Sequence, residues 1–227
     1  MILYVHLFYN DLKNYLQENP STSDGKPRIW TSPFLRTQQT TAGVVHGAQG
    51  YLDDCDIRET PFLMEQSFGI FSHLHNRDDQ AVKMPMEAEF HRKGLGREKF
   101  TTAKPQGESP FDTYKNVTHF LDTVYRDVPK NIQDIVAVSH GVTTRLIAMR
   151  VKHLSIRALD HFPNPGNGDV MVLNRKESGI GFDLHKVFDG EKGEAVNIDL
   201  GAMLLAKAPK LSAQNLPPVP EHLKMTL

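Results

Sequence analysis

A histidine stands at the end of a predicted buried strand, since His140 follows the apolar run 134–138. Short runs of β-branched residues are typical of fully buried parallel strands, and open α/β sheets bind ligands in the crevice outside the carboxyl ends of those strands. Residues 141–151 then predict a helix, whose free backbone N–H groups at Gly141 could face an anion. That geometry suits phosphate, and a protonated His140 would stabilise the charge on a phosphoryl group during its transfer.

Two further side chains fit the same chemistry. Arg36 lies just beyond a predicted strand at 28–32, and a guanidinium offers bidentate hydrogen bonds to phosphate oxygens. Glu65 lies ahead of a glycine turn and could give a proton to a leaving alkoxide and later take one from water. We predict Arg36, Glu65 and His140 as catalytic residues, with Arg36, His140 and Gly141 binding the substrate. The structural alternatives are a solvated arginine, a surface glutamate and a core histidine bonded to a backbone carbonyl.

Strands and helices alternate along the chain from residue 28 onward. We expect strands at 28–32, 56–60, 134–138, 169–173 and 182–188, and helices at 34–45, 109–126 and 141–151. Such alternation predicts an α/β fold, a three-layer α/β/α sandwich with a mostly parallel central sheet, whose last two strands form a hairpin at one edge. Apolar residues at helical intervals also predict a first helix from Val5 to Leu16, stopped by Pro20.

The start of the helix at 109–126 has a specific signal. Ser109 is the expected N-cap, Pro110 occupies the first helical position, and Asp112 can reach back in the manner of a capping box. Before it, residues 73–104 are polar and without clean periodicity, which predicts a long excursion that sets specificity.

Composition excludes several classes of partner. The 26 Lys+Arg residues nearly cancel the 27 Asp+Glu, so no basic field exists to hold nucleic acid or an anionic membrane. The single cysteine, Cys55, cannot form an intrachain disulfide, which favours a reducing compartment. Without a membrane span or signal peptide in the sequence, the cytoplasm is the expected location. We expect one domain over 1–206 and a tail over 207–227.

Several segments occur in an order that resembles the histidine phosphatase (phosphoglycerate mutase-like) superfamily. They are Thr31-Ser-Pro-Phe-Leu-Arg-Thr-Gln-Gln-Thr40, Leu63-Met-Glu-Gln-Ser-Phe-Gly69, and Gly107-Glu-Ser109 leading to Ser139-His-Gly141. The resemblance implies a phosphoglycerate mutase-like fold and metal-independent hydrolysis of a phosphomonoester without a cofactor, on a phosphorylated small molecule or a phosphoprotein. It assigns phosphate binding to Arg36, the acid to Glu65 and the second histidine to His140.

The chain departs from this family pattern at its N-terminus, because it contains no Arg-His-Gly, the motif whose histidine becomes phosphorylated. Two explanations fit. In the one that we favour, residues 1–18 are the family's first helix, and the first strand is missing through a shortened product, a misassigned start or a natural pseudoenzyme. In the other, residues 2–5 are that strand and His6 is a surrogate nucleophile, with Val5 and Leu7 in place of arginine and glycine. A missing strand would expose sheet edges and favour a homodimer.

A smaller departure is Asn116, where relatives often carry arginine. It concerns support of the site rather than its chemistry.

Two other functions remain open. A metal-dependent hydrolase could use a polar cluster in the excursion, formed by His73, His75, Asp78, Asp79, Glu87, Glu89 and His91. A catalytically dead pseudophosphatase could instead hold phosphate or a phosphorylated partner with Arg36, His140 and the helix start at Gly141.

Overall fold

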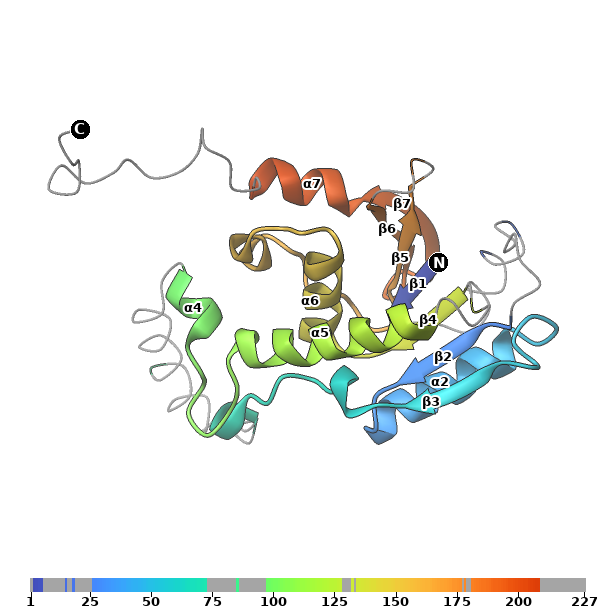
Figure 1. Ribbon diagram of the computed structural model, residues 1–227, viewed down its shortest axis with the longest axis horizontal. Coiled ribbons are helices and arrows are strands. Elements are labelled where there is room, and N and C mark those ends of the chain that lie inside the picture. Colours follow the sequence, from blue (N-terminus) through green and yellow to red (C-terminus); the bar gives the residue numbers. More distant parts are fainter. Residues whose placement is uncertain are drawn as a thin grey trace, which may run out of the picture.

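The computed structural model describes residues 2–5, 15, 18, 26–72, 85, 97–127, 132, 134–176, 178 and 181–208 (Figure 1). The strands are β1 (Ile2–Val5), β2 (Arg28–Thr31), β3 (Asp56–Glu59), β4 (Asp134–Val138), β5 (Val170–Arg175), β6 (Phe182–Asp189) and β7 (Glu194–Asp199). The α-helices are α2 (Leu35–Gly47), α4 (Arg97–Thr101), α5 (Pro110–Asp127), α6 (Gly141–Val151) and α7 (Leu200–Lys207). Short 3-10 helices lie at η1 (Pro61–Leu63), η2 (Gly69–Ser72) and η4 (Ile156–Asp160).

The seven strands of the described residues form one sheet in the order β3-β2-β4-β1-β5-β6-β7. Pairing is parallel from β3 through β2 and β4 to β1, and antiparallel from β1 through β5 and β6 to β7. The expected hairpin of β5 and β6 is present, and β7 with α7, which the sequence did not predict, continues it to the edge. The parallel half of the sheet brings the carboxyl ends of β2, β4 and β1 to one edge. Open α/β sheets commonly bind their ligands at this edge.

The expectation of a missing first strand is wrong. Residues 2–5 form β1, which lies between β4 and β5 at the centre of the sheet, with Val5 opposite Ala137 and Met171. Val5 is therefore a strand residue and not the start of a helix. Because β1 pairs on both sides, a lost central strand gives no reason to expect a homodimer.

Helices cover both faces of the sheet, as the three-layer prediction requires. Figure 1 shows α5 and α6 in front of the sheet and α2 behind it. Alternate residues of each strand point to opposite faces, so in β4 Ile135 and Ala137 join the core under α5 and α6, while Val136 and Val138 join the core under α2. Each face of the sheet is thus buried against the helices that cover it.

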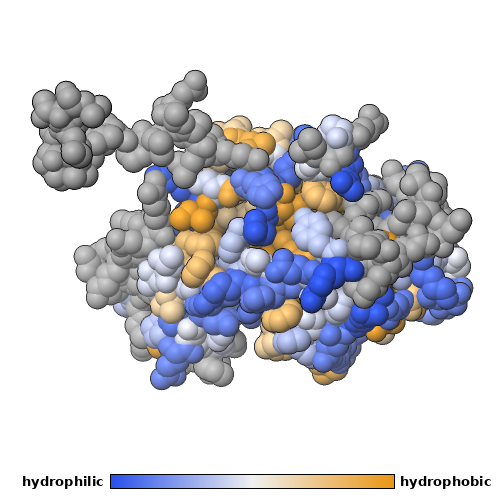
Figure 2. Space-filling view, viewed as in Figure 1, coloured by the Kyte–Doolittle hydropathy of each residue, from blue (hydrophilic) through white to orange (hydrophobic). Residues whose placement is uncertain are grey.

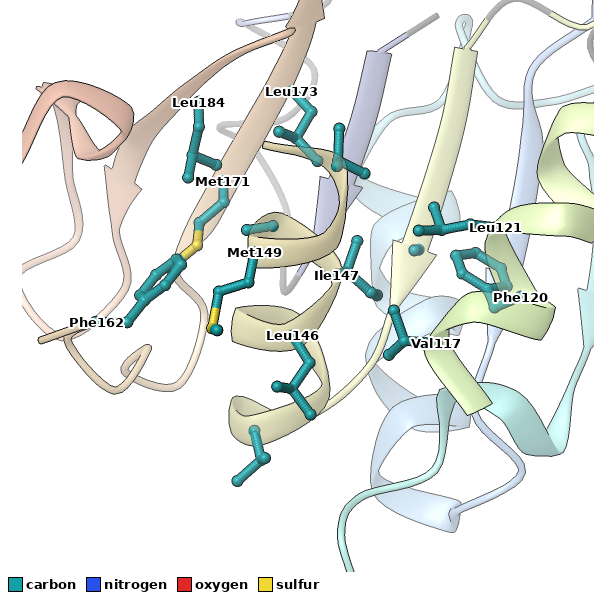
Figure 3. Close-up of a cluster of buried hydrophobic side chains, with 14 of the residues drawn as sticks. Val117, Phe120, Leu121, Leu146, Ile147, Met149, Phe162, Met171, Leu173 and Leu184 are labelled. Carbon is teal, nitrogen blue, oxygen red and sulfur yellow. The ribbon is translucent and has the colours of Figure 1, made fainter. Parts of the chain in front are cut away.

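The larger core forms where α5 and α6 pack on the sheet. Figure 3 shows Val117, Phe120 and Leu121 of α5 directed towards Ile147 of α6, and Met149 on the other side of α6, where Phe162 lies. The fully buried residues of α5 recur at intervals of three and four, which is the pattern of one helix face. Figure 2 shows hydrophilic side chains across the middle of this view, where α5 runs in Figure 1, so the other face of that helix meets solvent.

The predicted capping box begins α5. The Ser109 backbone N–H donates to Asp112 Oδ2 at 3.0 Å, and the Asp112 N–H donates back to Ser109 Oγ at 3.2 Å. Ser109 is buried, so these bonds satisfy donors that water cannot reach. Hydrogen bonds from Lys115 and Ser109 lower the pKa of Asp112 to about 2.

The C-terminal end of the described chain goes slightly beyond the predicted domain boundary at residue 206. Helix α7 runs to Lys207, and Ala208 is buried against the larger core. The remainder of the predicted tail lies outside the described residues. Within the described part of the chain, no helix has the length and apolar character needed to cross a membrane.

Candidate active site

His140 lies two residues after β4 and is almost completely buried. Its Nε2 atom is 2.9 Å from Ser32 Oγ, which follows the neighbouring strand β2, and its ring meets the Phe34 ring edge-on at a centroid distance of 5.1 Å. The two strands β2 and β4 pair in parallel, so the residues just beyond their carboxyl ends converge. This convergence fixes the orientation of the imidazole ring.

Arg36 reaches the same ring from the first turn of α2. Its Nε donates to His140 Nδ1 at 3.2 Å, and its Nη2 lies 2.9 Å from the same atom. A guanidinium carries donors only, so Nδ1 is the acceptor, and the ring proton sits on Nε2 and is donated to Ser32. The structure thus holds His140 as a neutral ring with Arg36 beside it, whereas the sequence-based role requires a protonated ring.

The Arg36 guanidinium also lies over the Phe34 ring, with 4.6 Å from its central carbon to the ring centroid. Such a contact between a cation and an aromatic face is attractive and keeps the planar group in one orientation. Arg36 thus lines the cavity, and two of its guanidinium nitrogens face the ring of His140.

Glu65 lies at the N-terminal end of α6 and not on the open surface. Its Oε1 accepts from the Val142 backbone N–H at 3.2 Å and from the Gln66 N–H at 3.1 Å. The expectation that free N–H groups at the start of this helix face an anion therefore needs correction, because the Glu65 carboxyl group accepts from the Val142 and Thr143 N–H groups. Burial raises the pKa of Glu65 despite these hydrogen bonds and the charge of Arg145.

The segment directly before Glu65 is bound to the end of the β4–α6 connection and to the first turn of α6. Ser139 Oγ donates to the Leu63 carbonyl at 2.8 Å, and Thr143 Oγ1 donates to the Met64 carbonyl at 2.7 Å. These two bonds hold the backbone directly before Glu65 against the helix start. The carboxyl group is consequently fixed relative to His140.

Two glycines of the motifs explain the next part of this segment. A Cβ atom at Gly69 would lie 2.0 Å from the Pro105 carbonyl oxygen, and a Cβ atom at Gly107 would lie 2.6 Å from the Ser67 carbonyl oxygen. Side chains at either position would collide with backbone, so the two segments can pack this closely only with glycine. The Gly107 motif therefore supports the Glu65 segment.

Arg145 is a site residue that sequence reasoning missed. It lies one turn into α6, donates from Nε to the Gly141 carbonyl at 3.3 Å, and faces the charges of Glu65 and Asp160. Burial lowers its pKa, and the two carboxylates oppose that effect. Its four-residue spacing from Gly141 on the helix was the only signal in the sequence, and its importance depends on the cavity.

One cavity of about 720 Å³ brings these groups together. Its lining comprises Arg36, Thr37, Gln39, Thr40, Glu65, Phe68, Ser139, His140, Gly141, Val142, Arg145, Asn164, Pro165, Asn167 and Gly168. Four of the five site residues predicted from the sequence line it, namely Arg36, Glu65, His140 and Gly141. A cavity of this size is in the range of small-molecule sites. It brings together a guanidinium, an imidazole and a carboxyl group, a set of chemical groups suited to phosphoryl transfer.

A family model for the histidine phosphatase superfamily (branch 1) matches residues 12–187 of the chain. The chain belongs to this superfamily. Among curated proteins it is 29% identical over 178 residues to phosphoglycerate mutase-like protein AT74 of Arabidopsis thaliana, covering 72% of this chain and 51% of that protein. It is also 29% identical over 129 residues to the broad-range acid phosphatase DET1 of Saccharomyces cerevisiae, covering 54% of this chain and 35% of that protein. The chain therefore matches about half or less of the length of these relatives.

Solved structures show the same fold at lower sequence identity. A mycobacterial glucosyl-3-phosphoglycerate phosphatase in complex with inorganic phosphate has a TM-score of 0.59 and 14% identity, with 84% of this chain and 96% of that chain covered. The α-ribazole phosphatase from Shigella flexneri has a TM-score of 0.56 and 17% identity, with 78% and 92% covered. The histidine phosphatase fold predicted from the motifs is confirmed.

Two sets of predicted residues lie outside the described residues. One is His6, the surrogate nucleophile, which follows Val5 of β1 in the chain. The other is the predicted metal-binding cluster, all seven members of which fall within 73–91. Within the part of the chain that the structure describes, no group of three or more His, Cys, Asp or Glu side chains could hold a metal ion.

Proposed function

We propose that this chain hydrolyses a phosphomonoester by transferring the phosphoryl group to a histidine and then to water, without a metal ion. The observation that carries the proposal is the convergence of Arg36, His140 and Glu65 on one cavity. The substrate is a phosphorylated small molecule or a phosphoprotein.

Binding of the phosphate would start from the Arg36–His140 pair. A phosphate dianion that enters the cavity offers Arg36 two oxygens in place of one ring nitrogen, and the bidentate charge-assisted arrangement is the stronger one. His140 Nδ1 is then released from the guanidinium, so it can take up a proton and donate to a phosphoryl oxygen. Charge that develops on the equatorial oxygens in the transition state meets two cationic donors.

Glu65 supplies and recovers the proton. In the first step a histidine nitrogen attacks phosphorus, the bond to the ester oxygen breaks, and the Glu65 carboxylic acid gives its proton to the leaving alkoxide. In the second step the Glu65 carboxylate takes a proton from water, whose oxygen attacks the phosphohistidine and releases inorganic phosphate and free histidine. The raised pKa of Glu65 supports this role, because it keeps the acid protonated at higher pH.

The nucleophile that we propose is His6. It follows Val5, the last residue of β1, and β1 runs parallel to β4, whose carboxyl end leads into His140. In the sequence a histidine thus comes directly after the central strand, whose carboxyl end lies at the edge of the sheet that carries the site. Among the described residues, His140 is the only histidine that lines the cavity, and Arg36 already contacts its ring.

Turnover of p-nitrophenyl phosphate in the presence of EDTA tests the proposal. We expect hydrolysis that survives the chelator, is lost in His140→Ala and His6→Ala, and persists in His46→Ala, an exposed histidine at the end of α2. Rapid quenching should trap phosphate in an acid-labile form on the wild-type chain and on His46→Ala, but not on His6→Ala. Activity that disappears with EDTA would favour the metal-dependent alternative.

A second candidate function is a pseudophosphatase that binds phosphate or a phosphorylated partner without turnover. Val5 and Leu7 on either side of His6 favour it, since the phosphate pocket loses one guanidinium and the turn loses a glycine. Calorimetric binding of orthovanadate that depends on Arg36 and His140, with no turnover of p-nitrophenyl phosphate, would support this function over the first.

A further inference from the structure

One wall of the cavity is a single loop, residues 164–168, between η4 and β5. Asn164, Pro165, Asn167 and Gly168 of this loop all line the cavity, and Asn164 lies against Gly141 at the start of α6. Arg36, Glu65 and His140, which we assign to the phosphate and the leaving oxygen, come from other elements. The loop is therefore a part of the lining that is available to contact the remainder of the substrate.

Two carboxamide groups are the polar side chains of this wall. Asn164 and Asn167 are both exposed, and neither side chain forms a hydrogen bond with another described residue. A carboxamide carries two donors and one acceptor without a net charge. It matches hydroxyl groups, which both donate and accept, and it supplies no positive charge for a second anion.

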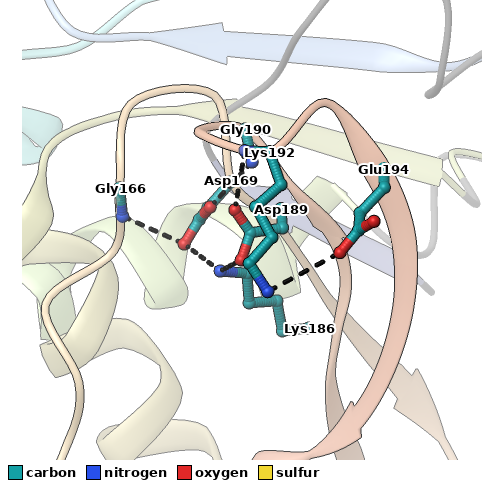
Figure 4. Close-up of polar contacts among 7 residues, drawn as sticks. All are labelled: Gly166, Asp169, Lys186, Asp189, Gly190, Lys192 and Glu194. Carbon is teal, nitrogen blue, oxygen red and sulfur yellow. Dashed lines mark hydrogen bonds and ion pairs between the residues drawn. The ribbon is translucent and has the colours of Figure 1, made fainter.

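A buried aspartate holds the loop in place. Figure 4 shows Asp169 between the loop and the β6–β7 turn, with one oxygen accepting from the Gly166 N–H at 2.9 Å and the other from the Gly190 N–H at 3.0 Å. Lys186 Nζ pairs with Asp169 at 2.8 Å and with Asp189 at 2.9 Å. Asp169 is 2% exposed, so its charge is stabilised by these donors and not by water.

The β6–β7 turn also contacts the loop directly. A Cβ atom at Gly190 would lie 2.1 Å from the Asn167 carbonyl oxygen, so only glycine permits this approach of the two backbones. Gly168 has a φ of +84°, a conformation that other residues rarely adopt. The backbone on both sides of Asn167 is consequently fixed by contacts behind the cavity wall.

We propose that Asn164 and Asn167 form a specificity wall for hydroxyl groups on the alcohol part of the phosphomonoester, and that Asp169 is the residue that positions this wall. The substrate class is a phosphorylated polyol or sugar. The inference rests on the proposed function for the orientation of the phosphate, but it concerns recognition and does not require turnover.

Binding of two phosphomonoesters separates this inference from hydrolysis. Glucose 6-phosphate presents several hydroxyl groups, whereas phenyl phosphate presents none, and both present the same phosphate. Affinities are measured by calorimetry if the chain does not turn them over, and kcat and KM are measured if it does. We expect the Asn164→Ala, Asn167→Ala double variant to weaken glucose 6-phosphate about tenfold or more relative to phenyl phosphate, as loss of two neutral hydrogen bonds predicts.

Asp169→Asn tests the positioning role, with Asp189→Asn as its matched control. Both variants remove one carboxylate from Lys186, but only Asp169 contacts Gly166 and Gly190. We expect Asp169→Asn to raise the KM or Kd for glucose 6-phosphate selectively, with kcat for phenyl phosphate unchanged, and Asp189→Asn to leave the ratio of the two affinities as in the wild type.

Two results would overturn the inference. One is an equal change for both esters in the double asparagine variant, and the other is a wild-type chain that binds phenyl phosphate as well as or better than glucose 6-phosphate. Loss of hydrolysis with selective binding intact would contradict the proposed function and leave the specificity wall standing. A phosphoserine peptide that outcompetes glucose 6-phosphate and depends on the same asparagines would assign the wall to peptide groups instead, which also overturns the polyol class.

Discussion

The guanidinium of Arg36 directs two nitrogen atoms at one ring nitrogen of His140, at 3.2 and 2.9 Å. Because arginine cannot accept a hydrogen bond, this contact holds the unprotonated Nδ1 towards the cavity and the N–H towards Ser32. Under the proposed function, each partner of this pair occupies the place that a phosphate oxygen would take. An entering phosphate would exchange this one contact for several charge-assisted ones.

Replacement of Arg36 should therefore weaken anion binding more than it weakens the fold. Hydrogen bonds to charged groups contribute about 1.5–3 kcal/mol, so we expect Arg36→Ala to lower the affinity for inorganic phosphate or vanadate at least tenfold. Arg36→Lys should recover only part of the loss, because an ammonium group cannot bind two oxygens in a fork. Calorimetric titration measures the affinity, and a thermal melt of each variant confirms that it is folded.

Arg58 provides the control for this prediction. It is an exposed arginine of β3 that pairs with Asp56 at 2.9 Å and does not line the cavity. Arg58→Ala should bind vanadate like the wild type. Equal losses in both variants would mean that general charge, and not the Arg36 site, attracts the anion.

Glu65 gives the activity a defined pH dependence. Burial raises its pKa, and a general acid works only while it holds its proton, so kcat/KM should fall as pH rises through a value above the ordinary range of a glutamate. Glu65→Gln should remove this descending limb and slow alkyl phosphates about 10²-fold or more. The pH profiles of kcat/KM for p-nitrophenyl phosphate and glycerol phosphate test whether Glu65 is the proton donor. Nitrophenolate leaves without much help from an acid, so hydrolysis of p-nitrophenyl phosphate should be less affected by Glu65→Gln. A similar loss on both esters would exclude Glu65 as the proton donor.

Arg145 should tune that limb without contacting the reacting atoms. Its positive charge lowers the pKa of Glu65, opposing the effect of burial. Arg145→Met removes the charge and keeps a long side chain, so the Glu65 pKa should rise further and the descending limb should move to higher pH. Arg145→Lys should keep the limb near its wild-type position. A purely structural role would lower activity at every pH by the same factor and leave the position of the limb unchanged.

The prediction of β4 was correct and the prediction of a missing first strand was wrong, and both results have a physical explanation. Residues 134–138 were predictable as a strand because both faces of β4 are buried and every residue is apolar or buried. Residues 2–8 were not, since an apolar run of this length suits a helix or a strand equally, and β1 is decided by its pairing with β4 and β5, more than 120 residues away in the chain. Local patterns do not report such pairing.

The candidate site divides in the same way. Arg36 and His140 follow strands directly, and their positions could be predicted from that adjacency. The contact of Glu65 with the Val142 N–H joins residues 77 apart, and the role of the 164–168 loop depends on Asp169, Lys186 and Gly190 behind it. These relations arise only when the sheet is assembled.

The cap of α5 links the Gly107 motif to the stability of the whole domain. Ser109 and Asp112 satisfy each other's backbone donors, and loss of an N-cap side chain costs about 1 kcal/mol. Ser109→Ala should lower the free energy of unfolding by this amount at neutral pH and lower the Tm by about 2–4 °C. Thr123→Ala, which removes an exposed hydroxyl within the same helix, should change stability little, because alanine is the better helix former.

Since the folded pKa of Asp112 is lowered to about 2, its stabilising effect is complete above the ordinary aspartate pKa and is lost as pH falls towards about 2. Urea titrations of the three proteins at neutral pH and at pH values down to that range measure both effects, and a Ser109→Ala protein as stable as the Thr123→Ala control would show that the cap does not stabilise α5.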